Sequence, residues 1–169
     1  AMLGAATATP GGGEEGAGGG GAGAMQSGGG CVTITDDDHI EKSNLNRQFL
    51  FRMDDVKRPK AEAAAGTALA MSPDMRIAVH LRRANKESED AFSDKFYTSQ
   101  DAVLNALDNV AARTYVDQRC VFNQRPLLES GTLGTKGHVQ VILPFATESY
   151  VASLFVSSSS SSVCPEVSP

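Results

Sequence analysis

The sequence predicts an α/β domain built on a parallel or mostly parallel sheet. Short runs rich in β-branched residues alternate with longer helix-forming runs between residues 31 and 150, which is typical of strand–helix–strand units. Acidic residues directly follow two of the strand-like runs, where open α/β sheets place ligand-binding side chains. The length agrees, because 169 residues suit one domain better than two.

The predicted elements follow one another in a regular order. The β-branched run 31–35 (CVTIT) predicts the first strand, and the Ala-rich run 60–70 predicts a helix that Pro73 brings to an end. The remaining predicted elements are, in order, a strand at 76–81, a helix at 88–97, a strand or buried turn at 102–106, a helix at 110–125, and strands at 126–129 and 139–144.

The two ends of the chain differ in composition from this body. Residues 1–30 hold 13 of the 17 glycines and no Lys or Arg, so this low-complexity segment has too little apolar surface to offset its chain entropy. Residues 151–169 contain an uninterrupted serine run and are predicted to form a flexible tail. We therefore expect an ordered domain over 31–150 with disordered Gly-rich and Ser-rich ends.

Charge and composition exclude several classes of function. A net charge of −5 argues against a general nucleic-acid or membrane-surface binder, and no apolar run approaches the roughly 18 residues of a membrane span. The cysteine count of 3 is odd and predicts no disulfide framework. The expected location is therefore the cytoplasm, the nucleus or both, with neither nucleic acid nor membrane as a partner.

Two acids lie where a nucleotide would bind such a sheet. Asp36 follows the strand 31–35 and could accept hydrogen bonds from both hydroxyls of a ribose, and Asp108 follows the predicted strand 102–106. A carboxylate at that edge could also hold Mg²⁺ that bridges phosphates. For both residues a capping role at a helix N-terminus is an equally simple reading.

Basic and glycine-rich segments add weaker signals. Arg47 and Lys60 could bind phosphate, although residues of these types are more often solvated surface charges. The segment 18–23 (GGGGAG) could form a phosphate loop, but any glycine pattern arises by chance in so Gly-rich a tract. Neither the histidines nor the cysteines show the spacing of a metal site.

Three longer strings are much more specific. They are TDDDHIEKSNLNRQFLFR at 35–52, NALDNVAAR at 105–113 and PLLESGTLGTKGHVQVILPFATESY at 126–150. Together they make the body, about 120 residues, resemble the second, active adenylation domain of ubiquitin-activating (E1) enzymes, which has a ThiF/MoeB-like fold. The resemblance implies a Rossmann-like, ThiF-type nucleotide-binding sheet.

The resemblance also implies an activity and a set of site residues. Enzymes of this family use ATP and Mg²⁺ to adenylate the C-terminal carboxylate of ubiquitin or a ubiquitin-like protein, and then form a thioester on a cysteine. By this resemblance the ribose site is Asp36 and the metal site is Asp108, followed by Asn109. The other implied nucleotide-site residues are Arg47 and Lys60 on the phosphates, Asn44 and Gln48 beside them, Ala84 and Asn85 near the adenine, and Gly21, Gly23 and Ala24 in the glycine loop.

The sequence departs from the family pattern at both ends. Only the segment Met25–Gly30 separates the glycine-loop-like residues from the strand 31–35, whereas a parallel crossover needs a dozen or more residues. A central strand and its helix are therefore expected to be missing, leaving an exposed sheet edge. Cys164 is not expected to be the thioester cysteine, because Pro165 and Glu166 follow it and an acidic neighbour disfavours the thiolate.

Two functional readings follow. In the first, the chain is a fragment of an E1 enzyme that serves ATP-dependent activation of ubiquitin or a ubiquitin-like modifier and is inactive alone. In the second, it is a non-catalytic interaction module or degenerate paralogue that pairs with a complementary E1 half. A dinucleotide-binding oxidoreductase is disfavoured, because the segment SNLNRQFLFR at 43–52 has no role in hydride chemistry.

Overall fold

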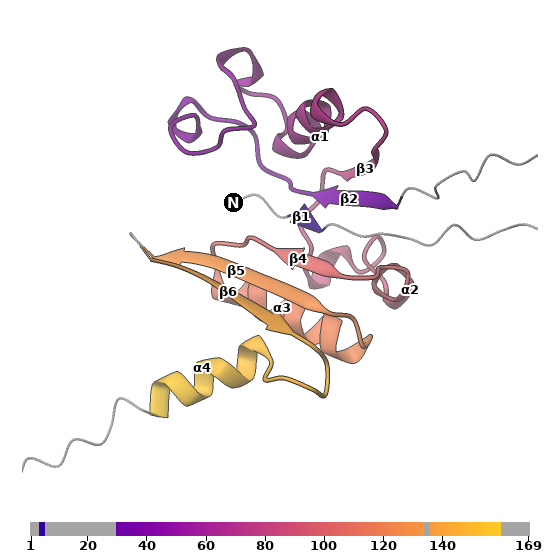
Figure 1. The fold of residues 1–169 in the computed structure, drawn as a ribbon, viewed down its shortest axis with the longest axis vertical. Helices are drawn as coiled ribbons and strands as arrows, with labels where there is room; N and C mark the ends of the chain where they lie inside the picture. The colour runs from indigo at the N-terminus through magenta and orange to yellow at the C-terminus, as the bar shows by residue number, and fades with distance from the viewer. Residues whose placement is uncertain (1–3, 6–29, 134–135, 160–169) are drawn as a thin grey trace, which may run out of the picture.

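The computed structural model describes residues 4–5, 30–133 and 136–159. Strands and helices alternate along it, as the sequence predicts (Figure 1). The elements are β1 (Gly4–Ala5), β2 (Cys31–Thr35), α1 (Lys60–Met71), β3 (Arg76–His80), α2 (Asp94–Thr98), β4 (Val103–Asn105), α3 (Val110–Phe122), β5 (Leu127–Leu133), β6 (Lys136–Ile142) and α4 (Tyr150–Ser159), with short 3₁₀ turns at Lys42–Asn44, Met53–Asp55 and Lys86–Ser88.

The strands form two small sheets rather than one. The first has the order β1-β2-β3 and the second β4-β5-β6. β2 is parallel to β3 across the helix α1, and β4 is parallel to β5 across α3. This arrangement confirms the predicted incomplete Rossmann-like α/β class. The pair β5-β6 is antiparallel, because the short connection after Leu133 permits a hairpin but no crossover.

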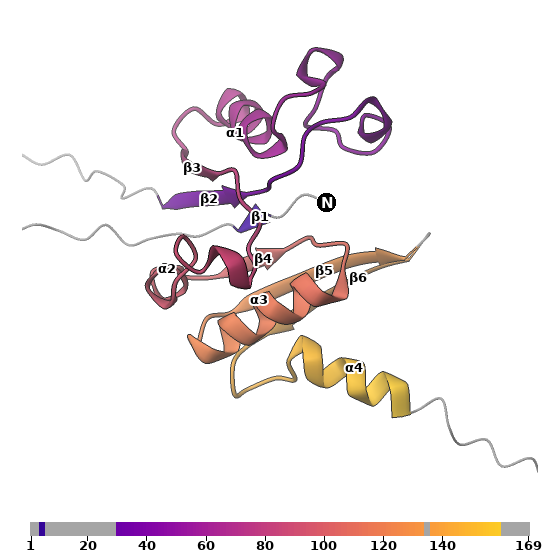
Figure 2. The ribbon, with the colours of Figure 1, turned by 180° about the vertical axis from the view of Figure 1, so that it is seen from behind.

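A strand that composition did not predict lies beside β2. β1 pairs antiparallel with β2, with Gly4 opposite Ile34 and Ala5 opposite Thr33. It lies between β2 and β4 in both views (Figures 1 and 2). The expectation that residues 1–30 contribute no strand is thus wrong at Gly4–Ala5, and the expected open edge of β2 is covered there. Ladder hydrogen bonds come from the backbone, so even Gly and Ala can make them.

Two layers of apolar side chains hold the fold together. Helix α3 packs on the β4-β5-β6 sheet (Figure 2). Phe92, Leu127 and Val116 belong to the cluster of buried apolar side chains in this half of the molecule. Alanines of α1, including Ala61 and Ala65, bury their methyl groups against β2 and β3. Small residues on that helix face let its backbone lie close to the sheet.

Several helix boundaries differ from the sequence prediction. α3 ends at Phe122 instead of residue 125, because Gln124 adopts a left-handed backbone with φ of 55°. The predicted helix 88–97 is mostly irregular, and only Asp94–Thr98 is helical. The reason lies in Ser88, whose hydroxyl donates to the Arg83 carbonyl at 2.6 Å and so favours a local turn over a helix.

The predicted C-terminal tail begins with a helix. α4 spans Tyr150–Ser159 and so includes the start of the serine run. Its first turn is anchored by the buried Asp117, whose carboxylate accepts the backbone N–H groups of Tyr150 at 3.1 Å and Val151 at 3.3 Å. A carboxylate placed there satisfies donors that a helix N-terminus otherwise leaves free. Among the described residues, no helix has the length and hydrophobicity to cross a bilayer.

Candidate functional site

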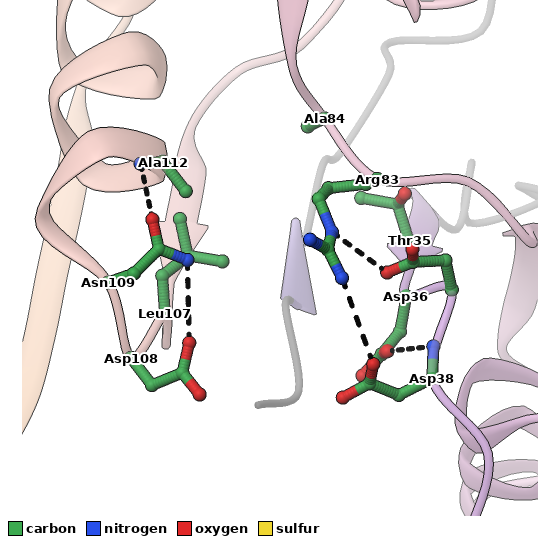
Figure 3. Close-up of a pocket in the computed structure, with 10 residues that line it drawn as sticks. Thr35, Asp36, Asp38, Arg83, Ala84, Leu107, Asp108, Asn109 and Ala112 are labelled. Atoms are coloured by element: carbon green, nitrogen blue, oxygen red, sulfur yellow. Dashed lines mark hydrogen bonds and ion pairs between the residues drawn. The ribbon is translucent and has the colours of Figure 1, made fainter.

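A cavity of about 260 Å³ lies at the carboxyl ends of β2, β3 and β4. In this type of sheet that edge collects the residues that follow each strand. Figure 3 shows the two walls facing each other, with the residues after β4 on one side and those after β2 and β3 on the other. The lining residues are Thr35, Asp36, Asp37, Asp38, Arg83, Ala84, Leu107, Asp108, Asn109 and Ala112.

Asp36 is the most unusual side chain of this wall. It is only 4% exposed, and its Oδ1 accepts the backbone N–H of Asp38 at 2.8 Å. Its Oδ2 is buried and has no hydrogen-bond partner among the described residues. Burial raises the pKa of Asp36, although the Asp38 N–H and the Lys60 charge oppose the shift. The site therefore holds a buried acceptor that a bound hydrogen-bond donor would satisfy.

Lys60 lies in an adjoining hollow that shares Asp37 and Asp38 with the cavity. It begins helix α1, and its buried ammonium donates to Asp38 Oδ2 at 2.8 Å. Burial lowers the pKa of Lys60 but the bond to Asp38 and the nearby carboxylates raise it, and the net direction is upward. The same bond holds the pKa of Asp38 below its usual value. Both groups are therefore charged at neutral pH.

Of the predicted nucleotide-site residues on and just after the 3₁₀ turn Lys42–Asn44, only Asn44 lies at the site. Asn44 lines the adjoining hollow, and its Oδ1 accepts the Glu41 N–H at 3.0 Å. Arg47 lies outside both hollows, because its guanidinium donates to the Ser43 carbonyl at 2.9 Å. Gln48 does not line them either, although its Oε1 is buried without a partner among the described residues.

The opposite wall carries Asp108 and Asn109. Asn109 caps α3, since its Oδ1 accepts the Ala112 N–H at 2.7 Å, so this helix is capped by Asn109 and not by Asp108, for which the sequence left a capping role open. Asp108 lines the cavity directly before it (Figure 3). Ala84 lines the cavity across from them, whereas Asn85 faces a neighbouring surface hollow.

Sequence reasoning missed Arg83. Its Nε lies 3.2 Å from Asp37 Oδ1 and its Nη2 lies 4.0 Å from Asp38 Oδ1 (Figure 3). Arg83 therefore links the segment after β3 to the acids that follow β2. The pairing with Asp37 raises the pKa of Arg83. The signal that could have found it is the same edge rule, because Arg83 stands just after strand β3.

The acids after β2 also form a group. One oxygen each of Asp36, Asp37 and Asp38 lies within 4.8 Å of the others. Three of the predicted site residues, Gly21, Gly23 and Ala24, lie outside the described residues, and so does Cys164, which is not expected to be the thioester cysteine.

The fold and the cavity together define an α/β protein with a polar cavity at the carboxyl ends of its strands. A family model, described as the ThiF family, matches residues 15–167, and the chain belongs to that family. The predicted resemblance to an E1 adenylation domain is thereby confirmed, and the comparisons with individual proteins agree with it.

The similar proteins are much longer than this chain. The chain is 58% identical over 124 residues to ubiquitin-activating enzyme E1 1 of Candida albicans. This aligned segment covers 72% of this chain and 12% of that protein. It is 56% identical over 119 residues to ubiquitin-like modifier-activating enzyme 6 of Mus musculus, covering 70% and 11%. It is 54% identical over 122 residues to ubiquitin-like modifier-activating enzyme 1 of Homo sapiens, covering 72% and 12%.

Proposed function

We propose that this chain forms the nucleotide-binding part of an adenylation domain that activates ubiquitin or a ubiquitin-like modifier with ATP. The ThiF family membership and the similarity to ubiquitin-activating enzymes support the class of reaction. The observation that carries the proposal is the unpartnered Oδ2 of Asp36 at the cavity wall.

A ribose fits this oxygen. A buried acceptor without a partner carries a desolvation cost of about 1–3 kcal/mol, and a ligand hydroxyl that donates to it removes that cost. Oδ1 is already bonded to the Asp38 N–H, so a hydroxyl can use Oδ2 without displacing anything. Ala84 on the neighbouring wall adds apolar surface suited to a base.

A divalent cation also fits the charge of the cavity. Its wall carries the carboxylates of Asp36, Asp37, Asp38 and Asp108 and the single cation Arg83, so a polyphosphate alone would be repelled. Oxygen ligands of this kind suit Mg²⁺, and Asp108 would hold it. Bound Mg²⁺ would supply neutralisation of the phosphate charge.

In the proposed reaction the modifier supplies the nucleophile. Its C-terminal carboxylate oxygen forms a bond to the α-phosphorus of ATP, and the bond from that phosphorus to the departing pyrophosphate breaks. The chain's own residues bind and orient the nucleotide, and Lys60 and Arg83 stabilise negative charge by preorganised electrostatics. We further propose that the chain is inactive alone, since its sequence departs from the family pattern at the glycine loop and at Cys164.

The test is calorimetric titration of the full chain with ATP and Mg²⁺. Asp36→Ala is expected to abolish binding, whereas Asp54→Asn, which changes an exposed acid on a 3₁₀ turn, keeps it. Circular dichroism establishes that each variant is folded. A folded wild-type chain that gives no heat would overturn the proposal and favour the interaction module. ATP–pyrophosphate exchange by the chain with ubiquitin alone would contradict the proposed inactivity.

A further inference from the structure

A partly buried arginine lies directly behind the Asp108 turn. Arg113 belongs to the first turns of α3, and its side chain is 12% exposed. Its Nε donates to the Leu107 carbonyl oxygen at 2.9 Å, and its Nη2 donates to the same oxygen. Because Leu107 immediately precedes Asp108, this fork fixes the backbone from which the Asp108 side chain extends.

A fully buried acid holds Arg113 in turn. Arg113 Nη1 forms an ion pair at 3.2 Å with Oε1 of Glu129, whose side chain is 0% exposed. Among the described residues this oxygen accepts no hydrogen bond, so the contact is electrostatic. The other oxygen of Glu129 accepts from Asn105 Nδ2 at 2.9 Å, and the Ser130 hydroxyl donates to the Asn105 carbonyl at 2.7 Å. Burial raises the pKa of Glu129, while Asn105 and Arg113 oppose the shift.

The strand β5 is shaped around the guanidinium. A Cβ added at Gly131 would lie 2.6 Å from Arg113 Nη1 and 2.7 Å from Nη2, and also 2.6 Å from His138 Cε1. At these distances an added Cβ would force the ends of the Arg113 and His138 side chains to shift, so glycine at 131 lets the guanidinium lie this close to the strand. On its other side the guanidinium carbon lies 5.9 Å from the centroid of the Tyr150 ring.

We propose that Arg113 is a positioning residue for the nucleotide site, holding the turn Leu107–Asn109 from behind while Glu129 holds Arg113. The turn is then fixed at both ends, by Arg113 at Leu107 and by the Asn109 cap on α3. The consequence for Asp108 rests on the proposed function, because only there does this carboxylate hold a cation. Groups behind a metal ligand commonly change metal affinity or activity by about 10-fold to 100-fold.

The alternative is that Arg113 and Glu129 only stabilise the fold. Removing one partner leaves an uncompensated buried charge, so a single neutral variant could simply unfold. The combined change Arg113→Gln with Glu129→Gln removes both charges, and Arg113→Lys keeps the charge but loses the two-pronged contact. Gly131→Ala displaces the guanidinium without altering any charge.

The matched control is Arg119→Gln. Arg119 lies on the same helix and is 19% exposed, but its Nη2 pairs with Asp94 at 2.7 Å and its guanidinium covers the Tyr97 ring at 5.6 Å. It therefore anchors α3 by the same kind of contact, yet its contacts with Asp94 and Tyr97 lie away from the Asp108 turn. Its removal should affect stability without affecting the turn.

The first measurement is amide hydrogen exchange at Ala112 without nucleotide. The Ala112 N–H donates to Asn109 Oδ1, so its protection reports whether the turn stays in place. Exchange of the Ala112 amide should be faster in each of three variants: the charge-neutral double variant, Arg113→Lys and Gly131→Ala. In a variant that loses the Asn109 cap, the exchange rate should rise by about fivefold. Arg119→Gln should leave it unchanged. If all three variants fold and exchange the Ala112 amide at the wild-type rate, the proposal is overturned.

The second measurement separates positioning from folding. Affinities for adenosine and for ATP with Mg²⁺ are compared by calorimetry. We expect the double variant to weaken ATP·Mg²⁺ by about 10-fold or more and adenosine by less than about twofold, because adenosine carries no phosphate for a cation at Asp108 to bridge. Equal losses for both ligands would mean a purely structural role. If the wild type binds neither, the proposed function fails, and Ala112 exchange alone decides whether Arg113 holds the turn.

Discussion

Replacing Asp36 by asparagine should stabilise the protein while abolishing nucleotide binding. The ionised carboxylate is 4% exposed, and Oδ2 lacks a partner among the described residues. Asparagine has nearly the same shape as aspartate and keeps an oxygen that can accept the Asp38 N–H. In the wild type this N–H donates to Asp36 Oδ1 at 2.8 Å. The introduced amide N–H groups would face the carboxylates of Asp37 and Asp38, whose oxygens lie within 4.8 Å.

The expected gain at pH 7.5 is about 1–2 kcal/mol in the free energy of unfolding. Relief of a buried, unsatisfied charged acceptor contributes about 1–3 kcal/mol. The lost attraction to Lys60 subtracts less than about 1 kcal/mol, because Lys60 keeps its 2.8 Å bond to Asp38. Natural binding sites commonly hold residues that are needed for function but lower the stability of the folded protein.

The pH dependence gives the sign of the effect. Burial raises the folded-state pKa of Asp36 above the unfolded value of 3.8, so the folded state binds more protons between the two values. The contribution of this group to stability therefore falls as the pH rises through that window. The advantage of the asparagine variant should be largest at neutral pH and should shrink as the pH falls toward 4.

The assay is urea unfolding of wild type and variant at pH 7.5 and at pH 4. Asp37→Asn is the matched control: its carboxylate is solvent-exposed and pairs with Arg83, and its loss should change stability by less than about 1 kcal/mol. An Asp36→Asn variant that is less stable than wild type at pH 7.5, or equally favoured at both pH values, would refute the reasoning.

Three further outcomes are expected. Phe92→Ala should lower the unfolding free energy by about 3–5 kcal/mol, since this ring is 0% exposed, while Phe122→Ala at 73% exposure should cost less than about 0.5 kcal/mol in the same urea titration. Asp117→Ala should lower the unfolding free energy by about 2 kcal/mol and the melting temperature with it, because the first turn of α4 loses its acceptor. Burial raises the pKa of Cys120 to about 12, so iodoacetamide should alkylate this thiol only in urea. Peptide mass spectrometry should find the half-buried Cys31 labelled before Cys120.

Local chemistry was enough to predict the elements that the site depends on. The β-branched run 31–35 and the Ala-rich run after Pro59 became β2 and α1 nearly residue for residue. Placement of Asp36 and Asp108 at one edge followed from the rule that residues after parallel strands gather together, and the cavity contains both. These predictions succeeded because strand propensity, helix propensity and chain direction are properties of neighbouring residues.

Features that depend on distant segments came only from the tertiary structure. The pairing of Gly4–Ala5 with β2 is made by backbone groups and leaves no mark on composition. Arg47 and Arg83 are both arginines near strand or turn ends, yet one bonds to its own turn and the other bridges Asp37 and Asp38. The contact of Arg113 with Glu129 joins a helix to a strand. The sequence by itself determined which segments become strands and helices and which edge collects the acids. Only packing decided which charges meet there, because the free energy of a charge depends on its burial and its partners in space.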